Sequence, residues 1–98
     1  MKKEIYLTIL FDYYEKLLTE QQRKYFVAYY FDNLSLGEIS ENMNVSRNAV
    51  HKQLKVIEEK LIEYEDILHI YEKDKKLEEV INTIEDKCLK EKLKEIIK

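Results

Sequence analysis

Residues 46–57 combine cationic and amide side chains and contain no carboxylate. An arginine such as Arg47 can form two hydrogen bonds to guanine, and an asparagine such as Asn48 can form two to adenine. Lys52 and Lys55 are suited to phosphate oxygens. A solvated helix face would have a similar composition. The spacing favours DNA contact, and the expected contact residues are Ser35, Ser46, Arg47, Asn48, His51, Lys52 and Lys55.

A capped helix and a tight turn would position these side chains. Ser35 followed by Glu38 is a capping-box pattern, in which each residue satisfies the other's backbone N–H. Ile39 and Met43 then recur at helical spacing. Asn44 stands where the chain must turn, in a left-handed conformation that asparagine tolerates better than most residues. The pattern therefore predicts a short helix that ends at a turn near residue 44.

A second helix is expected directly after this turn. Ser46 is a favourable N-cap residue, and Val45 is expected to fill the space between the two helices. The inward stripe of the second helix is expected at Val50, Leu54, Ile57 and Leu61. A helix-turn-helix uses this arrangement to place its second helix in the major groove.

The composition favours one small all-helical domain. The chain has 98 residues, no proline and a single glycine, Gly37, while Leu, Ile, Lys and Glu are abundant. Charged residues make up 38% of the chain, yet the formal net charge is only −3. Because non-specific binding to nucleic acid normally uses a broad basic surface, DNA contact must here come from a local basic patch and depend on salt.

Several other classes of protein and site are disfavoured. Cys88 is the only cysteine, so no disulfide framework is expected, and we predict that it is a buried small apolar side chain. His51 and His69 lie outside any metal-ligand spacing, so neither a metal nor another cofactor is expected. No catalytic motif is present, which argues against an enzyme. A signal peptide and a membrane span are not expected, which favours the cytoplasm.

Two helices are predicted in the N-terminal part. The first should cover residues 3–17, and the second should begin after Thr19, which forms a capping-box pattern with Gln22, and run to about Phe31. Tyrosines cluster here at helical spacing without interleaved basic residues, so core packing is favoured over a stacking platform for single-stranded nucleic acid. The expected buried residues are Ile5, Ile9, Leu10, Tyr13 and Leu17 on the first helix and Phe26, Tyr29 and Tyr30 on the second.

The C-terminal part is expected to prolong the helical pattern. The second motif helix has no obvious stop before Asp66, and its acidic distal half is predicted to be a solvated face. Residues 72–76 are predicted to form a hinge or a solvated turn. Beyond them the apolar stripe shifts by one position, which predicts a break near Asp86 or a broad apolar face.

We accordingly expect a helix-turn-helix core over residues 1–71 and a C-terminal helical extension of the same domain over residues 72–98. The apolar stripe of the extension must be covered. It can fold back on its own domain or pack on a second subunit, and a homodimer is slightly favoured because many helix-turn-helix proteins pair to read two half-sites.

Residues 17–65 resemble the YlxM family of small bacterial helix-turn-helix proteins, and the run SLGEISE followed by VSRNAVHKQL is the specific part of the match. The same portion is similar to the last DNA-binding domain of bacterial sigma factors. It departs from that pattern at Asn44, where glycine is frequent, and at Ser40, where alanine is usual. The matching positions are Leu18, Thr19, Gln22, Arg23, Leu34, Ser35, Glu38, Ile39, Val45 and Ser46.

This resemblance implies an all-α fold, a helix-turn-helix bundle of the sigma-factor C-terminal domain type with an added C-terminal helical tail. It also implies a DNA-binding regulatory role linked to the signal recognition particle pathway, because YlxM genes typically lie beside those for the particle's GTPases. The alternative is a protein- or RNA-binding adaptor of that particle without sequence-specific DNA binding. The net charge of −3 favours the adaptor, whereas the capped turn and the carboxylate-free helix start favour double-stranded DNA.

Overall fold

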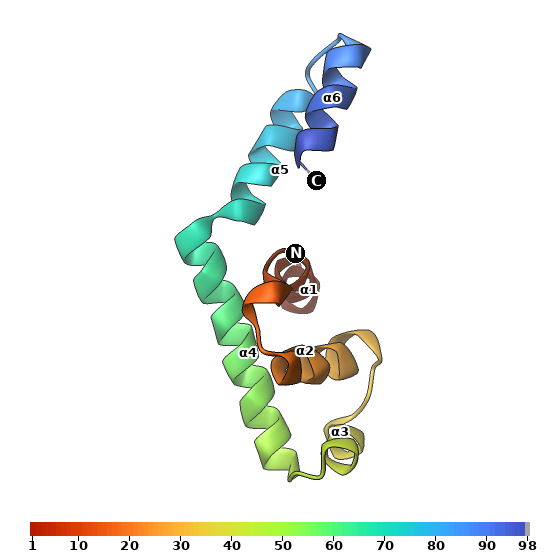
Figure 1. Cartoon of the computed structure of the whole chain (residues 1–98), viewed down its shortest axis with the longest axis vertical. Helices are drawn as coiled ribbons and strands as arrows, with labels where there is room; N and C mark the ends of the chain where they lie inside the picture. The colour runs from red at the N-terminus through yellow and green to blue at the C-terminus, as the bar shows by residue number, and fades with distance from the viewer. Residues whose placement is uncertain (98) are drawn as a thin grey trace.

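The computed structural model describes residues 1–97, in which short helices pack along one long helix (Figure 1). The molecule is elongated, with dimensions of 55 × 25 × 24 Å. This range holds helices and turns and no strand, which confirms the expected all-α helix-turn-helix fold. The elements are α1 (Lys3–Tyr14), the 3₁₀ turn η1 (Glu15–Leu17), α2 (Glu20–Phe26), the π-helical turn η2 (Val27–Phe31), α3 (Leu36–Met43), α4 (Arg47–Leu68), α5 (Ile70–Ile81) and α6 (Lys87–Ile97).

The core lies between α4 and the three helices that precede it. Helices α1, α2 and α3 all pack against α4. The predicted inward stripe of α4 is confirmed, since Val50, Leu54, Ile57 and Leu61 are all buried. The Phe26 ring stacks on Phe11 with 4.4 Å between ring centroids. Burial of this one stripe fixes which side of α4 faces the bundle.

The predicted buried face of α1 is largely wrong. Only Leu10 of the expected set is buried, Ile9 is half-buried, and Ile5, Tyr13 and Leu17 are exposed. The helix is apolar on most of its sides, so its sequence contains two stripes of helical spacing that could each have been buried. The core takes the other stripe, which consists of Leu7, Leu10, Phe11 and Tyr14. Contact with α4 decides between the stripes, and that contact is invisible in the local pattern.

The second predicted helix is confirmed at its start. Thr19 Oγ1 accepts from the Gln22 N–H at 3.1 Å, and the Gln22 side chain accepts from the Thr19 N–H at 2.9 Å. The helical path continues through η2 to residue 31. Phe26 is buried and Tyr30 is half-buried as expected, whereas Tyr29 is exposed.

The long helix runs past Asp66 to Leu68, as the absence of an earlier stop allowed, but the joint that follows is not where it was predicted. Residues 72–76 lie inside α5 and form neither a hinge nor a turn. The chain instead changes direction at His69, whose φ of 54° and ψ of 29° are left-handed. The acidic half of α4 is also not wholly solvated, because Glu65 is only 5% exposed. Its carboxylate binds the start of α5, which explains why the joint is ordered.

Helices α5 and α6 form an antiparallel hairpin that projects from one end of the bundle (Figure 1). The break expected near Asp86 is confirmed, since Asp86 Oδ1 accepts from the Cys88 N–H at 3.0 Å and the Leu89 N–H at 3.2 Å. Cys88 is exposed, so its predicted burial is wrong. Residue 98 of the predicted extension lies outside the described range. Among the helices described, none combines the length and apolar character that crossing a bilayer requires.

Candidate nucleic-acid interface

The first helix of the motif, α3, begins at a complete capping box, as predicted. The Glu38 N–H donates to Ser35 Oγ at 3.1 Å, and the Ser35 N–H donates to Glu38 Oε1 at 2.9 Å. The bond from the Ser35 backbone lowers the pKa of Glu38, because it stabilises the charged carboxylate. Glu38 is therefore engaged in the helix start, and exposed Ser35 still has its hydroxyl hydrogen to donate.

The turn of the motif forms at the predicted residue. Asn44 has φ 56° and ψ 48°, the left-handed conformation that ends a helix, and the Val45 N–H donates to the Ser40 carbonyl at 3.0 Å. Val45 does not fill the space between the two helices, because 38% of it is exposed. Leu36 and Met43, the first and last residues of α3, are half-buried and pack against the core instead. The turn thus directs Val45 outward.

The second helix of the motif begins at its predicted cap. Ser46 Oγ accepts from the Ala49 N–H at 3.1 Å. Because the stripe that starts at Val50 is buried, a helix of 100° per residue turns Asn48, Lys52 and Lys55 to the opposite side, where all three are exposed. The outward face of α4, defined here as Arg47, Asn48, His51, Lys52 and Lys55, is therefore an exposed surface without carboxylates.

Arg47 differs from the other members of this face because its side chain lies against α3. A Cβ built on Gly37 would come within 2.8 Å of Arg47 Nη2 and 3.1 Å of Nε. The guanidinium therefore rests on the first turn of α3, at a place where only a glycine leaves it room. This contact joins the two helices of the motif. Sequence reasoning missed the pairing, although Gly37 was the one signal available, as the only glycine of the chain.

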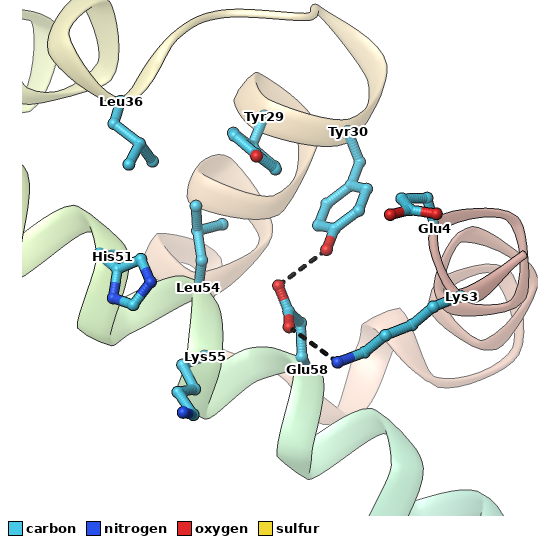
Figure 2. A pocket seen from close by; sticks show the side chains of 9 residues that line it. All are labelled: Lys3, Glu4, Tyr29, Tyr30, Leu36, His51, Leu54, Lys55 and Glu58. Atoms are coloured by element: carbon cyan, nitrogen blue, oxygen red, sulfur yellow. Dashed lines mark hydrogen bonds and ion pairs between the residues drawn. The ribbon is translucent and has the colours of Figure 1, made fainter.

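His51 and Lys55 border a notch between α4, α1 and the turn η2 (Figure 2). In the notch, Tyr30 Oη donates to Glu58 Oε2 at 2.7 Å, and Lys3 Nζ lies 3.9 Å from Glu58 Oε1. Burial, followed by the bond to Glu58, raises the pKa of Tyr30, so the phenol remains a donor. Glu58, the first carboxylate of α4, is thus drawn toward the core, and Lys3 adds a cation that sequence reasoning missed.

The structure brings most of the predicted residues together. The five residues of the outward face lie on the first turns of α4, and Ser46 caps the same helix. Ser35 lies on the other helix of the motif, at the α3 start over which Arg47 folds. The geometry is that of a helix-turn-helix whose second helix presents donors and cations along one edge of the molecule.

A family profile described as "Putative helix-turn-helix protein, YlxM / p13 like" (UPF0122) matches residues 1–98. The chain belongs to this family. A UPF0122 protein of Halalkalibacterium halodurans is 43% identical and is covered over 79% of its length by 88% of this chain. One from Ureaplasma urealyticum is also 43% identical, with 96% of this chain and 95% of the relative aligned. A Bacillus thuringiensis relative is 37% identical over 99% of this chain and 93% of its own length.

These matches confirm the YlxM resemblance and extend it over the whole chain, α5 and α6 included. The family description names a helix-turn-helix and no catalytic activity. In a helix-turn-helix protein of this kind, the exposed side chains at the start of α4 form the candidate binding surface, and the contact between Gly37 and Arg47 positions one of them.

Gly37→Ala should change the position of the Arg47 guanidinium while leaving its charge unchanged. The new methyl group meets the end of a flexible side chain, so the guanidinium can move aside at little cost. Alanine is the better helix former, and we expect the free energy of unfolding to rise by roughly 0.5–1 kcal/mol. Thermal unfolding would show this as a melting temperature about 4 °C higher, and NMR would show a changed environment of the Arg47 Nε–H.

Asn42→Ala is a suitable control, since it adds helix propensity at an exposed site of α3 without approaching Arg47. A Gly37→Ala protein that is less stable than wild type, or one with an unaltered Arg47 signal, would contradict the packing described above.

Proposed function

We propose that this UPF0122 protein binds double-stranded DNA through the outward face of α4 and acts as a transcription regulator in the cytoplasm. In this proposal Arg47, Asn48 and His51 reach base edges, while Lys52 and Lys55 contact phosphates. Ser35 and Ser46 donate to the backbone of the duplex from the starts of α3 and α4. Two copies act together, since helix-turn-helix proteins commonly read paired half-sites.

The observation that carries this proposal is the exposure of the whole outward face without a competing carboxylate. The stripe behind it is fully buried, so α4 can enter a groove without losing core contacts. Glu58 is held by Tyr30 and Lys3 on the side toward α1, away from the approach of a phosphate. Because the net charge is −3, affinity must come from these few cations, which makes it strongly dependent on salt.

The test is a titration of a fluorescein-labelled mixed-sequence duplex at several salt concentrations, read by anisotropy. The double variant Lys52→Glu and Lys55→Glu should weaken binding on the order of 100-fold at about 50 mM salt and should lower the slope of log K against log salt by about 2. Lys16→Glu with Lys24→Glu is the matched control. It changes the net charge equally at exposed sites of η1 and α2 and should leave most of the affinity.

Base reading can be tested once a preferred duplex has been selected from a random pool. Arg47→Ala should reduce affinity for that duplex by about 1–3 kcal/mol and have less effect on the mixed-sequence duplex. Gly37→Ala keeps the charge of Arg47 but moves its guanidinium. It should therefore also reduce the preference for the selected duplex over the mixed-sequence duplex. Wild-type protein that binds no duplex at low salt would end the proposal.

A second candidate is an adaptor role with the RNA or a GTPase of the signal recognition particle. The exposed carboxylates Glu59, Glu63 and Asp66 on the distal half of α4 favour a basic protein surface at that end, whereas RNA would have to bind the cationic outward face. Capture of the particle's RNA or GTPase by a chain that does not bind duplex DNA would support this role. The Lys52→Glu and Lys55→Glu variant should then retain a partner that binds the acidic half.

A further inference from the structure

The hairpin of α5 and α6 is far less buried than the rest of the molecule. Ile81 is its only buried residue within the described range, and no residue of α6 is buried. The two helices have 12 and 11 residues, lengths at which an isolated helix is marginal in water. The hairpin projects from the bundle and leaves the sides of both helices open (Figure 1). The hairpin therefore has much apolar surface that the chain itself does not cover.

Both helices present large apolar side chains to solvent. Leu77 is 51% and Val80 is 62% exposed on α5, while Leu89 is 47% and Ile96 is 79% exposed on α6. These four residues are called the hairpin face below. Apolar side chains that gather on two neighbouring helices are the usual mark of a protein interface, whereas single ones are not.

The charges around the hairpin face are self-complementary. Over residues 72–86 the carboxylates outnumber the lysines, and over α6 the lysines outnumber the glutamates. The charged residues of the first segment are Glu72, Lys73, Asp74, Lys75, Lys76, Glu78, Glu79, Glu85 and Asp86. Those of α6 are Lys87, Lys90, Glu91, Lys92, Lys94 and Glu95. When two such hairpins meet about a two-fold axis, α6 of each can lie beside α5 of the other, so opposite charges meet twice.

We propose that the hairpin face binds the same face of a second copy of this chain, so that two hairpins form a four-helix bundle. Knobs-into-holes packing of antiparallel helices would cover Leu77, Val80, Leu89 and Ile96 of both copies. A purely acidic or purely basic partner would match only one of the two helices, which is why a second copy fits better.

This inference rests on the proposed homodimer and names its surface, but it does not require DNA binding. The hairpin and the start of α4 lie at opposite ends of the molecule (Figure 1). Pairing through the hairpins therefore leaves the outward face of α4 free in both copies. The dimer would be elongated, with the two candidate DNA-binding faces at its far ends.

Sedimentation of the full chain over a range of micromolar concentrations tests the pairing. Wild-type protein should be a dimer, and Val80→Glu with Ile96→Glu should raise the dimer dissociation constant about 100-fold or more, because four charges would be buried in each dimer. Both positions are exposed in one copy, so the variant should keep its helical circular dichroism. Ile67→Glu, at a site of α4 that is 66% exposed, is the matched control and should remain dimeric.

A spin label on Cys88, the only cysteine and an exposed one, supplies a second measurement. Helices of this length extend about 18 Å, and packed helices lie 8–10 Å apart, so two labels should fall within roughly 30 Å of each other. Wild-type protein that is monomeric, a double variant that still dimerises, or labels too far apart to couple would each overturn the proposal. Duplex binding by the monomeric variant would show separately whether DNA contact stands without pairing.

Discussion

Phe26→Ala is expected to lower the free energy of unfolding by about 4 kcal/mol, the loss typical for a buried phenylalanine. The Phe26 ring is fully buried and stacks between Phe11 and Tyr30, with 4.4 Å between ring centroids on each side. Removal of the ring leaves a cavity that three rigid helices cannot close. The total free energy of unfolding of a domain of this size is only about 5–15 kcal/mol. The melting temperature of the variant should therefore be roughly 20 °C lower.

Phe31→Ala is the control for this prediction. Phe31 lies in the same aromatic cluster but is 47% exposed, so its removal leaves much less of a cavity and should cost about 1 kcal/mol. Urea unfolding of both variants, with the m value monitored, gives the two free energies. Equal losses for the two variants would mean that the stacking around Phe26 does not hold the bundle together.

Most of the helix-turn-helix could be predicted from the sequence because it is specified by local interactions. Ser35 with Glu38 and Thr19 with Gln22 form the hydrogen bonds that their three-residue spacing allows. Asn44 takes the left-handed conformation for a reason contained in its own side chain. The stripe that begins at Val50 was readable because polar residues occupy the rest of that helix, so only one face could be buried.

The features that were mispredicted depend on contacts between distant residues. The first helix is apolar on most sides, so the choice of Leu7 over Ile5 for the core is made by its packing partners. Glu65 reads as one more charge in an acidic run, and its burial depends on Tyr14, 51 positions earlier in the chain. Within the candidate interface, Lys3 reaches the notch only because α1 packs beside α4.

The position of the joint between core and hairpin has the same cause. A run of charged residues at 72–76 predicts a solvated break, but these residues occupy the exposed sides of α5. His69 gave no comparable signal, because histidine mostly adopts negative φ even though it is enriched among the non-glycine residues found near φ 54°. The left-handed conformation of His69 is stabilised by the hydrogen bonds that the backbone N–H groups of the next three residues donate to Tyr14 and Glu65.

Replacement of Glu65 should be the most destabilising change at that joint. Glu65 Oε1 accepts from Tyr14 Oη at 2.5 Å and from the Tyr71 N–H at 3.1 Å, and Oε2 accepts from the Glu72 N–H at 3.0 Å. The Ile70 N–H donates to Tyr14 Oη at 3.2 Å. The carboxylate thus caps α5 and ties it to α1. Burial, followed by the bond to Glu65, raises the pKa of Tyr14 to about 12, so the phenol stays a donor.

Glu65→Leu leaves these donors without a partner in a site that is 5% exposed, and we expect it to lose about 3 kcal/mol of unfolding free energy. Glu65→Gln keeps one acceptor oxygen and should lose less. Tyr14→Phe removes a single hydroxyl and should cost about 1 kcal/mol. Glu63→Leu makes the same change at an exposed site of α4 and should stay within about 0.5 kcal/mol of wild type.

Hydrogen exchange distinguishes a lost cap from a general loss of stability. In Glu65→Leu the amides of Tyr71 and Glu72 should exchange faster than global unfolding explains, whereas amides of the buried stripe of α4 should follow the global value. The hairpin would then be held less firmly at His69. Helix α5 would keep the hydrogen bonds from Tyr13 Oη to Asp74 at 2.8 Å and from the Ile70 N–H to Tyr14 Oη at 3.2 Å, together with its packing against α1 and α4. If exchange at the start of α5 matched that of the core, the carboxylate of Glu65 would not be what fixes the hairpin to the bundle.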